Sequence, residues 1–370
     1  MVEVFFATNR GFEGPEDAPE FQKTPLKGSV QEFRVGTAQV ARTSKRYKFK
    51  SAKLQAERLT GDESTERVGS VAMYERMQTL MRKQQCDVVI FVHGFANSFQ
   101  SAMERGAELH DKYMVPRNPG PTGRAKSSKR PEGLVNPLPF VFSWPSDGQL
   151  FPRRSYFDDR ADAAGAGRAM ARTFLRLVDF LREANRRSTP DLGTAPNKKE
   201  VCGQRIHLVV HSMGSYALSS TIQAIVEHSG RRALPRIFDH VFLMSADEDD
   251  DALQNPDKLG RLHELAAKIH VYHSPSDRAL VVSDYTKSNP ARLGHDGPRT
   301  LDGLSDRIDV IDCQDVDETA DFGDGAHQYY RSRQEVVDDV MQVLADIPAT
   351  SIPGRVQIGP NRYRILQAKG

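Results

Sequence analysis

The chain has 370 residues, of which 38% are hydrophobic and 27% are charged, and its formal net charge is +2 at pH 7. This length suits one large α/β domain with insertions, and the small net charge gives no general attraction for nucleic acid. The cysteines are few and widely spaced, so they imply no disulfide framework or zinc pattern and fit a reducing compartment: Cys86, Cys202 and Cys313.

The amino-terminal segment predicts a strand over residues 2–8 and lacks the basic start and long apolar stretch of a signal peptide. No apolar run is long enough to span a bilayer, so we expect a cytoplasmic protein. Residues 11–20 are rich in glycine, proline and acidic residues and predict a loop. Alternating apolar and polar residues over 31–40 predict a half-exposed strand near a sheet edge, and residues 47–49 predict another edge strand.

The apolar residues over 71–83 have helical spacing and predict a helix. Residues 86–92 form a continuous apolar run, as expected of a parallel strand covered on both faces, and a second helix follows it. Residues 115–137 mix proline, glycine and basic residues and predict a mobile surface insertion. A strand over 139–144 and a long helix over 158–187 come next.

The second half of the chain continues this alternation. It predicts a strand over 206–211, a helix to about residue 228, strands over 241–245, 269–272 and 310–313, and a last helix over 336–344. Residues 356–358 and 363–366 predict a terminal hairpin. Alternating strands and helices indicate one doubly wound, mostly parallel sheet of the α/β class. We assign a single domain to residues 1–349 and a tail or short hairpin to residues 350–370.

The segment His211-Ser-Met-Gly214 directly follows an apolar strand and directly precedes a helix. This pattern predicts a nucleophile elbow, a sharp strand-to-helix turn that presents a serine oxygen, here Ser212, at the edge of the sheet. The usual form is Gly-x-Ser-x-Gly, and Val210 replaces its first glycine. Valine there raises the question of how sharp the turn is.

A serine nucleophile needs a base, an acid that orients the base, and donors for the oxyanion. In the α/β-hydrolase order the acid and then the histidine follow the serine, each after a strand. Asp277 follows the strand at 269–272 and His327 follows the strand at 310–313, so they are our candidates for acid and base. Asp247, after the preceding strand, is the alternative acid, although an acidic cluster such as 247–251 more commonly forms a solvated helix start.

The oxyanion donors are expected at two backbone amides: that of Met213, after the serine, and that of Phe95, after His93-Gly94 at the end of another strand. Asn97 is expected to cap the next helix and His211 to be a packed histidine that points away across the elbow. Trp144 ends a strand at the same sheet edge and is expected to form a wall of the site or to fill the core.

Several short motifs occur in an order that resembles a bacterial α/β-hydrolase family once catalogued as a domain of unknown function, the DUF900 group, over about residues 2 to 346. The motifs are Val4-Phe-Phe-Ala-Thr-Asn-Arg10, Phe91-Val-His-Gly-Phe95, Phe142-Ser-Trp-Pro-Ser146, Tyr156-Phe-Asp-Asp-Arg160, His211-Ser-Met-Gly214, Ser276-Asp-Arg-Ala-Leu280 and His327-Gln-Tyr-Tyr330. The resemblance implies the α/β-hydrolase fold and serine hydrolase activity without an agreed substrate. By motif it implies Ser212, Asp277 and His327 as the triad.

The leading hypothesis is therefore a serine hydrolase that cleaves a carboxylic ester or thioester, including lipid-like esters, without a cofactor or metal. The alternative is a binding or scaffolding protein that keeps the fold without the chemistry, which Val210 favours. Gly165-Ala-Gly167 follows no strand and lacks a third glycine, so nucleotide binding has little support. We expect a small acyl ester as partner and no nucleic acid. The basic insertion could contact an anionic membrane surface, although a solvated loop is the simpler interpretation.

Overall fold

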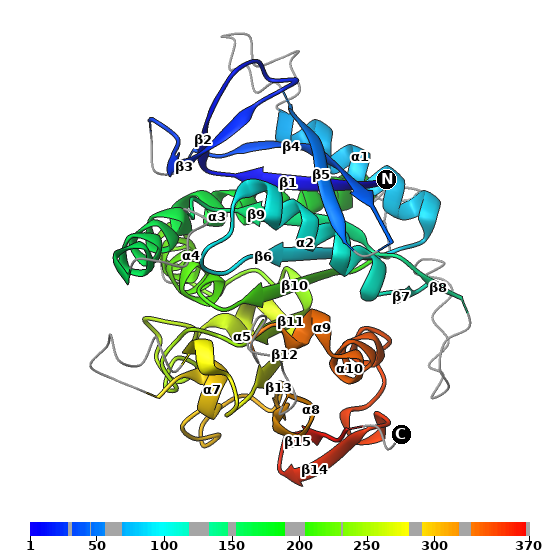
Figure 1. Cartoon of the computed structure of the whole chain (residues 1–370), viewed down its shortest axis with the longest axis vertical. Helices are drawn as coiled ribbons and strands as arrows, with labels where there is room; N and C mark the ends of the chain where they lie inside the picture. Colours follow the sequence, from blue (N-terminus) through cyan, green and yellow to red (C-terminus); the bar gives the residue numbers. More distant parts are fainter. Residues whose placement is uncertain are drawn as a thin grey trace.

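The computed structural model describes residues 1–28, 32–44, 46–55, 69–117, 133–146, 153–188, 204–230, 232–280, 291–317 and 327–367. Within these residues eleven strands form one sheet (Figure 1). From one edge to the other they are β14 (Arg355–Gly359), β15 (Arg362–Ile365), β13 (Ile308–Asp312), β12 (Ala266–His273), β11 (Phe238–Met244), β10 (Ile206–His211), β6 (Val88–Val92), β9 (Leu138–Ser143), β1 (Val2–Thr8), β4 (Arg34–Arg42) and β5 (Tyr47–Leu54).

Every neighbouring pair from β15 to β1 is parallel, whereas β14, β4 and β5 pair antiparallel at the two edges. The carboxyl ends of the parallel strands therefore meet along one edge of the sheet, which is where ligands bind in open α/β sheets. The prediction of a doubly wound, mostly parallel sheet is confirmed.

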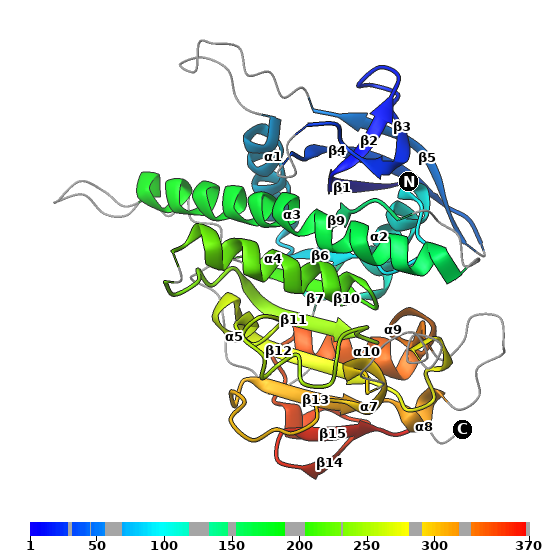
Figure 2. The same cartoon turned by 90° about the vertical axis from the view of Figure 1, so that its left-hand side faces the viewer.

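Helices cover both faces of the sheet, because its central strands are apolar on both sides. One face carries α3 (Arg153–Ser188) and α4 (Gly214–His228), with α1 (Gly69–Gln84) packed against α3, and the other carries α2 (Phe99–Lys112), α9 (Tyr329–Ser332) and α10 (Gln334–Leu344) (Figures 1 and 2). The shorter helices are α5 (Leu262–Leu265), α7 (Leu293–Asp296), α8 (Gln314–Asp317) and η1 (Ala349–Ser351).

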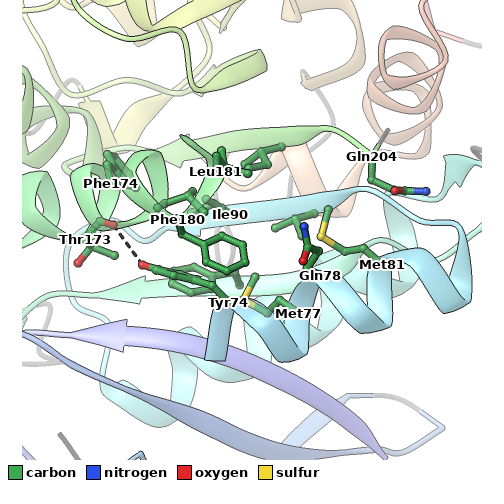
Figure 3. A pocket seen from close by; sticks show the side chains of 14 residues that line it. Tyr74, Met77, Gln78, Met81, Ile90, Thr173, Phe174, Phe180, Leu181 and Gln204 are labelled. Atoms are coloured by element: carbon green, nitrogen blue, oxygen red, sulfur yellow. Dashed lines mark hydrogen bonds between the residues drawn. The ribbon is translucent and has the colours of Figure 1, made fainter. Parts of the chain in front are cut away.

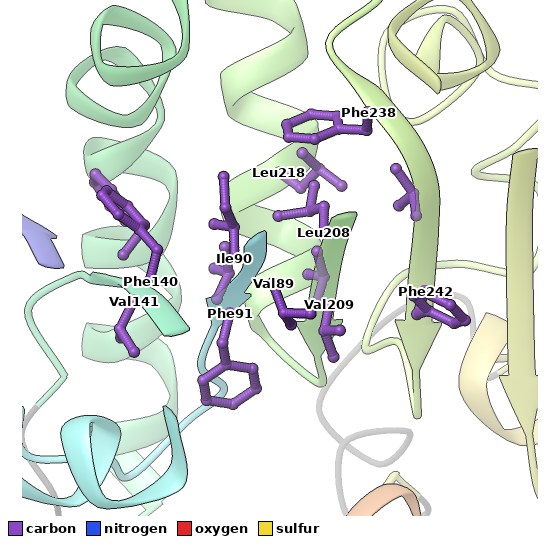
Figure 4. Close-up of a cluster of buried hydrophobic side chains, with 14 of the residues drawn as sticks. Val89, Ile90, Phe91, Phe140, Val141, Leu208, Val209, Leu218, Phe238 and Phe242 are labelled. Atoms are coloured by element: carbon purple, nitrogen blue, oxygen red, sulfur yellow. The ribbon is translucent and has the colours of Figure 1, made fainter. Parts of the chain in front are cut away.

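Buried apolar side chains gather where β6 and β10 lie side by side under α3 and α4 (Figure 4). All five residues of β6 and all six of β10 are buried. Leu218 of α4 lies over these strands, and Phe238 at the start of β11 extends the same layer. This packing holds the ends of β6 and β10 rigidly, and both strands lead into candidate site loops.

Three segments outside the central strands compare differently with the prediction from the sequence. Residues 11–20 are not simply a loop, because β2 (Arg10–Glu13) pairs with β3 (Glu20–Pro25) and Phe21 stacks on Phe99 with ring centres 3.7 Å apart. The pairing depends on that distant aromatic contact, which local composition does not reveal. Residues 115–137 are described only at their ends, where β7 (Val115–Pro116) pairs with β8 (Leu134–Val135); the predicted mobile insertion between them lies outside the described residues.

The last segment is the carboxyl-terminal hairpin, β14 and β15, which lies where the sequence predicts a terminal hairpin. It is not a separate appendage, since β15 extends the main sheet by pairing parallel with β13. In the described part of the chain no helix is long and apolar enough to cross a membrane.

Candidate active site

The strand-to-helix turn at Ser212 is sharp. β10 ends at His211 and α4 begins at Gly214, and Ser212 has a positive φ of 54°, which a residue other than glycine rarely adopts. The Ser212 N–H donates to the Met244 carbonyl at 3.0 Å, and the Ser215 hydroxyl donates to the Ser212 carbonyl at 2.6 Å. These bonds hold the serine in a strained conformation, as a nucleophile elbow requires.

Two glycines allow the elbow to lie against the end of β6. A Cβ at Gly214 would lie 2.7 Å from the His93 carbonyl oxygen, and a Cβ at Gly94 would lie 2.8 Å from the Ser212 Cβ. Both distances are shorter than real Cβ contacts, so only glycine fits without displacement. Val210 is fully buried in β10, and the turn two residues later still forms. Val210, in place of the first glycine of the usual pattern, therefore does not prevent the sharp turn at Ser212.

His327 and Asp277 are in direct contact. The His327 Nδ1 and the Asp277 Oδ2 are 2.8 Å apart, and the Asp277 side chain is fully buried. The other oxygen, Oδ1, accepts the N–H groups of Ala279 and Leu280 at 3.1 and 3.3 Å, which fixes the carboxylate. With its Nδ1–H donated to Asp277, His327 keeps the lone pair on Nε2 that a general base needs.

Burial lowers the pKa of His327, but the charge of Asp277 and its hydrogen bond outweigh burial and raise the pKa above its ordinary value. Asp247 contributes to the same increase, and Arg105 opposes it. The imidazolium form is therefore stabilised, as it must be in a base that holds a proton during a reaction.

His211 holds the segment that carries His327. Its Nε2 donates to the His327 carbonyl at 2.9 Å, and its ring lies 4.6 Å from the rings of both His327 and Tyr330. Burial lowers the pKa of His211 well below its ordinary value, so the ring is neutral. The sequence predicts a packed histidine that points away across the elbow. The ring is packed, but the sequence does not reveal that it contacts the segment of His327, 116 positions later.

Asp247 lies beside Ser212 but is bonded to other partners. Its N–H donates to the Ser212 carbonyl at 3.2 Å, its Oδ2 accepts the Tyr156 hydroxyl at 2.6 Å, and its Oδ1 lies 3.9 Å from the Arg292 Nε. The structure thus bonds Asp277, and not Asp247, to the His327 ring.

The acidic segment 247–251 is not a solvated helix start, which corrects the expectation from the sequence. Asp247 and Glu248 are only 3% and 2% exposed, and no helix begins at these described residues. Their neighbour Asp249 accepts from the Lys258 ammonium at 2.7 Å and pairs with the buried Arg292. Burial raises the pKa of Glu248 to about 7. The buried carboxyl groups have partners from elsewhere in the chain, Arg292 for Asp247 and the Ser219 hydroxyl for Glu248, which local composition does not reveal.

The two amides expected to bind an oxyanion belong to Met213, in the elbow itself, and to Phe95, in the loop after β6. Neither donates a hydrogen bond to any acceptor within the described ranges. The close approach of Gly94 to Ser212 brings the loop of Phe95 against the serine. The Phe95 ring meets the Tyr156 ring edge-on, with centres 5.6 Å apart. Two unused donors next to a strained serine are what an oxyanion site requires.

Of the two places expected for Trp144, the structure shows the core and not a wall of the site: Trp144 is fully buried, stacks on the His93 ring at 5.0 Å and donates its Nε1–H to the His93 carbonyl at 2.8 Å. One further expectation is wrong. Asn97 does not cap α2, because Ser98 takes that position and accepts from the Ser101 N–H. Both side chains instead donate to backbone carbonyls at the end of β6, Trp144 to that of His93 and Asn97 to those of Gly94 and Phe95. The sequence around either residue does not indicate these bonds.

An apolar pocket lies away from these residues, between α1, α3 and the strands β6, β9 and β10 (Figure 3). Tyr74, Met77, Phe180 and Leu181 line it, and the Tyr74 hydroxyl donates to the Thr173 carbonyl at 3.1 Å. It includes Val88 and Ile206 at the starts of their strands, whereas Ser212 lies after a strand end, so this pocket is separate from the candidate site. Among the described residues no group of three or more histidine, cysteine or acidic side chains could hold a metal ion.

A mostly parallel sheet with a sharp strand-to-helix turn after β10 is the architecture of an α/β hydrolase, and the order of Ser212, Asp277 and His327 along the chain fits that class. The comparison with protein families agrees: a model described as an alpha/beta hydrolase of unknown function (DUF900) matches residues 70–346. The chain belongs to this family, as its motifs predict, and membership of an α/β-hydrolase family indicates a hydrolase. A search of curated proteins found no match.

Proposed function

We propose that the protein is a serine hydrolase that cleaves a carboxylic ester or thioester through an acyl-enzyme. Ser212 is the nucleophile, His327 the general base and Asp277 the acid that orients it. The Phe95 and Met213 amides bind the oxyanion. The observation that carries this proposal is the 2.8 Å contact between His327 and the buried Asp277, in the same strand-end region as a serine held at a φ of 54°.

In the first half of the reaction, the His327 Nε2 takes the proton of the Ser212 hydroxyl while Oγ attacks the carbonyl carbon. The carbonyl oxygen becomes an oxyanion between the two amides. When the tetrahedral intermediate collapses, its bond to the alcohol or thiol breaks, and His327 gives its proton to that leaving group. Water, deprotonated by the same histidine, then attacks the acyl-enzyme and regenerates the Ser212 hydroxyl while the carboxylic acid leaves.

The alternative, a scaffolding protein without chemistry, rests on Val210. The strained serine and the unused amides favour catalysis instead, since strain at a backbone position persists only where the surrounding structure imposes it. We therefore keep ester hydrolysis as the single proposed function, with a small acyl ester as the partner and a cytoplasmic location.

Labelling with a fluorophosphonate probe tests the proposal. The purified wild type should be labelled covalently and Ser212→Ala should not, at equal melting temperature. Ser229→Ala, at the far end of α4, is the matched control because its hydroxyl donates to the local Val226 carbonyl at 3.0 Å, one helical turn away. Folded wild-type protein that shows no label above the Ser212→Ala background would refute the enzyme assignment.

A panel of 4-nitrophenyl esters of increasing acyl length, with matching thioesters, then defines the substrate class. An ester of the panel is accepted as a substrate only if the wild type hydrolyses it and Ser212→Ala does not. A burst of 4-nitrophenol equal to the enzyme concentration, followed by slower turnover, is the kinetic mark of the acyl-enzyme.

A further inference from the structure

Arg10, the last residue of the first motif, is buried beside the candidate oxyanion loop, which we define as residues 93–97. It is only 1% exposed. Its Nη2 donates to the Asn97 carbonyl at 2.7 Å, its Nη1 to the Ser146 carbonyl at 3.0 Å, and its Nε to the Ser143 hydroxyl at 3.0 Å. One planar side chain thus joins the oxyanion loop to the end of β9.

Asp159 of α3 contacts the same loop from another side and is also 1% exposed. Its Oδ2 accepts the Ala96 N–H at 3.3 Å and the Ser146 hydroxyl. The Ser146 oxygen in turn accepts the Asn97 N–H at 3.0 Å. Asp159 therefore fixes both amides that follow Phe95, the Ala96 N–H directly and the Asn97 N–H through the Ser146 hydroxyl.

The loop needs these contacts because its backbone is strained. Ala96 has a φ of 56°, in the left-handed region that costs energy for a residue with a side chain. The Asn97 Nδ2 also donates to the carbonyls of Gly94 and Phe95 at 3.0 and 2.8 Å. The peptide groups around the Phe95 N–H are thus bonded, while that N–H itself donates to nothing in the described part of the chain.

We propose that Arg10 and Asp159 are positioning residues that hold the Phe95 N–H at the oxyanion position. This inference rests on the proposed function. It gives a shared role to three motifs that the triad leaves unused, those ending at Arg10, Ser146 and Arg160. The two positioning residues touch no reacting atom and act through the loop.

Electrostatics supports the pairing of these two groups. Burial lowers the pKa of Arg10 to about 9, and the carboxylates of Asp159 and Asp162 oppose this effect. The guanidinium is therefore still charged at neutral pH. A buried cation without a compensating carboxylate is strongly destabilising, so the two side chains are expected to depend on one another. A neutral hydrophobic pair could fill the same space but could not bond the loop carbonyl.

The test uses the best 4-nitrophenyl ester of the panel and its thiono analogue, in which sulfur replaces the carbonyl oxygen. Sulfur accepts hydrogen bonds poorly, so the ratio of the two rates reports on the oxyanion donors. Removing one such donor lowers kcat by about 10²–10³-fold. We expect Arg10→Lys and Asp159→Ala to lower kcat on the oxygen ester by about 10²-fold, to change KM less than about twofold, and to reduce the preference for oxygen over sulfur.

Two further variants separate positioning from stability. Asp159→Asn keeps an oxygen that can accept the Ala96 N–H and should recover part of the lost kcat. Arg355→Lys is the matched control: Arg355 is another buried arginine, 1% exposed, whose Nη2 donates to Asp339 at 2.7 Å on the β14 side of the sheet. It should lower the melting temperature without changing the oxygen-to-sulfur ratio.

Folded Arg10→Lys and Asp159→Ala proteins that keep the wild-type ratio would overturn the inference and leave the proposed function standing. Wild-type protein without Ser212-dependent hydrolysis would overturn both. If the two variants do not fold, Ser146→Ala decides the matter, because it removes only the hydroxyl between Asp159 and the Asn97 N–H. An unchanged ratio in that variant also counts against the positioning role.

Discussion

Replacing each candidate acid by its amide gives the sharpest test of the triad. Asp277→Asn removes the charge 2.8 Å from the His327 Nδ1 and allows the ring to take the wrong tautomer. We expect kcat to fall by about 10⁴-fold, or about 5 kcal/mol in activation free energy. Asp247→Asn keeps an oxygen that can accept the Tyr156 hydroxyl. It affects the pKa of His327 only by removing a nearby negative charge. We expect less than a tenfold loss, which corresponds to at most about 1.4 kcal/mol.

The assay is the initial rate of hydrolysis of a 4-nitrophenyl ester over a range of concentrations, with the melting temperature measured on the same samples. Asp338→Asn serves as the control, because this aspartate on α10 is exposed and its side chain accepts the Gln334 amide at 3.0 Å, on a helix away from His327. A large loss in Asp247→Asn, together with a loss below tenfold in Asp277→Asn, would refute the assignment of the acid. Losses of equal size in both variants would refute the reasoning from the hydrogen bond.

Three other predictions follow from the site and from the sheet. Gly94→Ala places a Cβ 2.8 Å from the Ser212 Cβ and should lower kcat by about 10²-fold, since a displacement of about 1 Å can cost that much; an unchanged kcat in folded protein would contradict it. Because the pKa of His327 is raised by Asp277 despite its burial, the acid limb of kcat/KM should have its midpoint above about 6.5, and a midpoint below that value would contradict the contact. Burial lowers the pKa of His240 to about 4. As the pH falls, the unfolded chain therefore binds a proton at this histidine before the folded protein does. The free energy of unfolding measured in urea should decrease by up to about 3 kcal/mol between pH 6.5 and 4. This loss should shrink in His240→Gln and persist in His228→Gln, which changes an exposed histidine.

The sequence predicted correctly those features that depend on residues adjacent in the chain, such as a buried strand or a sharp turn. The apolar run of β6 predicts a buried parallel strand because both its faces are covered, and all its residues are buried. The segment around Ser212 predicts a sharp turn because few residue types fit one, and the serine has the positive φ of such a turn. The family assignment rests on the order of such segments and is confirmed.

The network around the oxyanion loop shows why the rest was not predictable. Arg10 contacts Asn97, 87 positions away, and Ser146, 136 positions away. No spacing rule connects residues at such separations. An arginine after a strand also looks like a surface residue, because its burial depends on carbonyl groups supplied by distant loops. The sequence left Trp144 open between the site wall and the core for the same reason, since the partner of its Nε1–H, the His93 carbonyl, is 51 positions away.

What the sequence determined by itself was the class of fold, the serine at the elbow and the order in which acid and base could follow. It favoured Asp277 over Asp247 as the acid but kept both open, because both follow parallel strands and satisfy that order. The tertiary structure bonds His327 to Asp277 at 2.8 Å and places Tyr156 and Arg292 around Asp247, which is why we propose Asp277 as the acid. Hydrogen bonds act over about 3 Å, so the choice depends on how distant loops pack and not on their order along the chain.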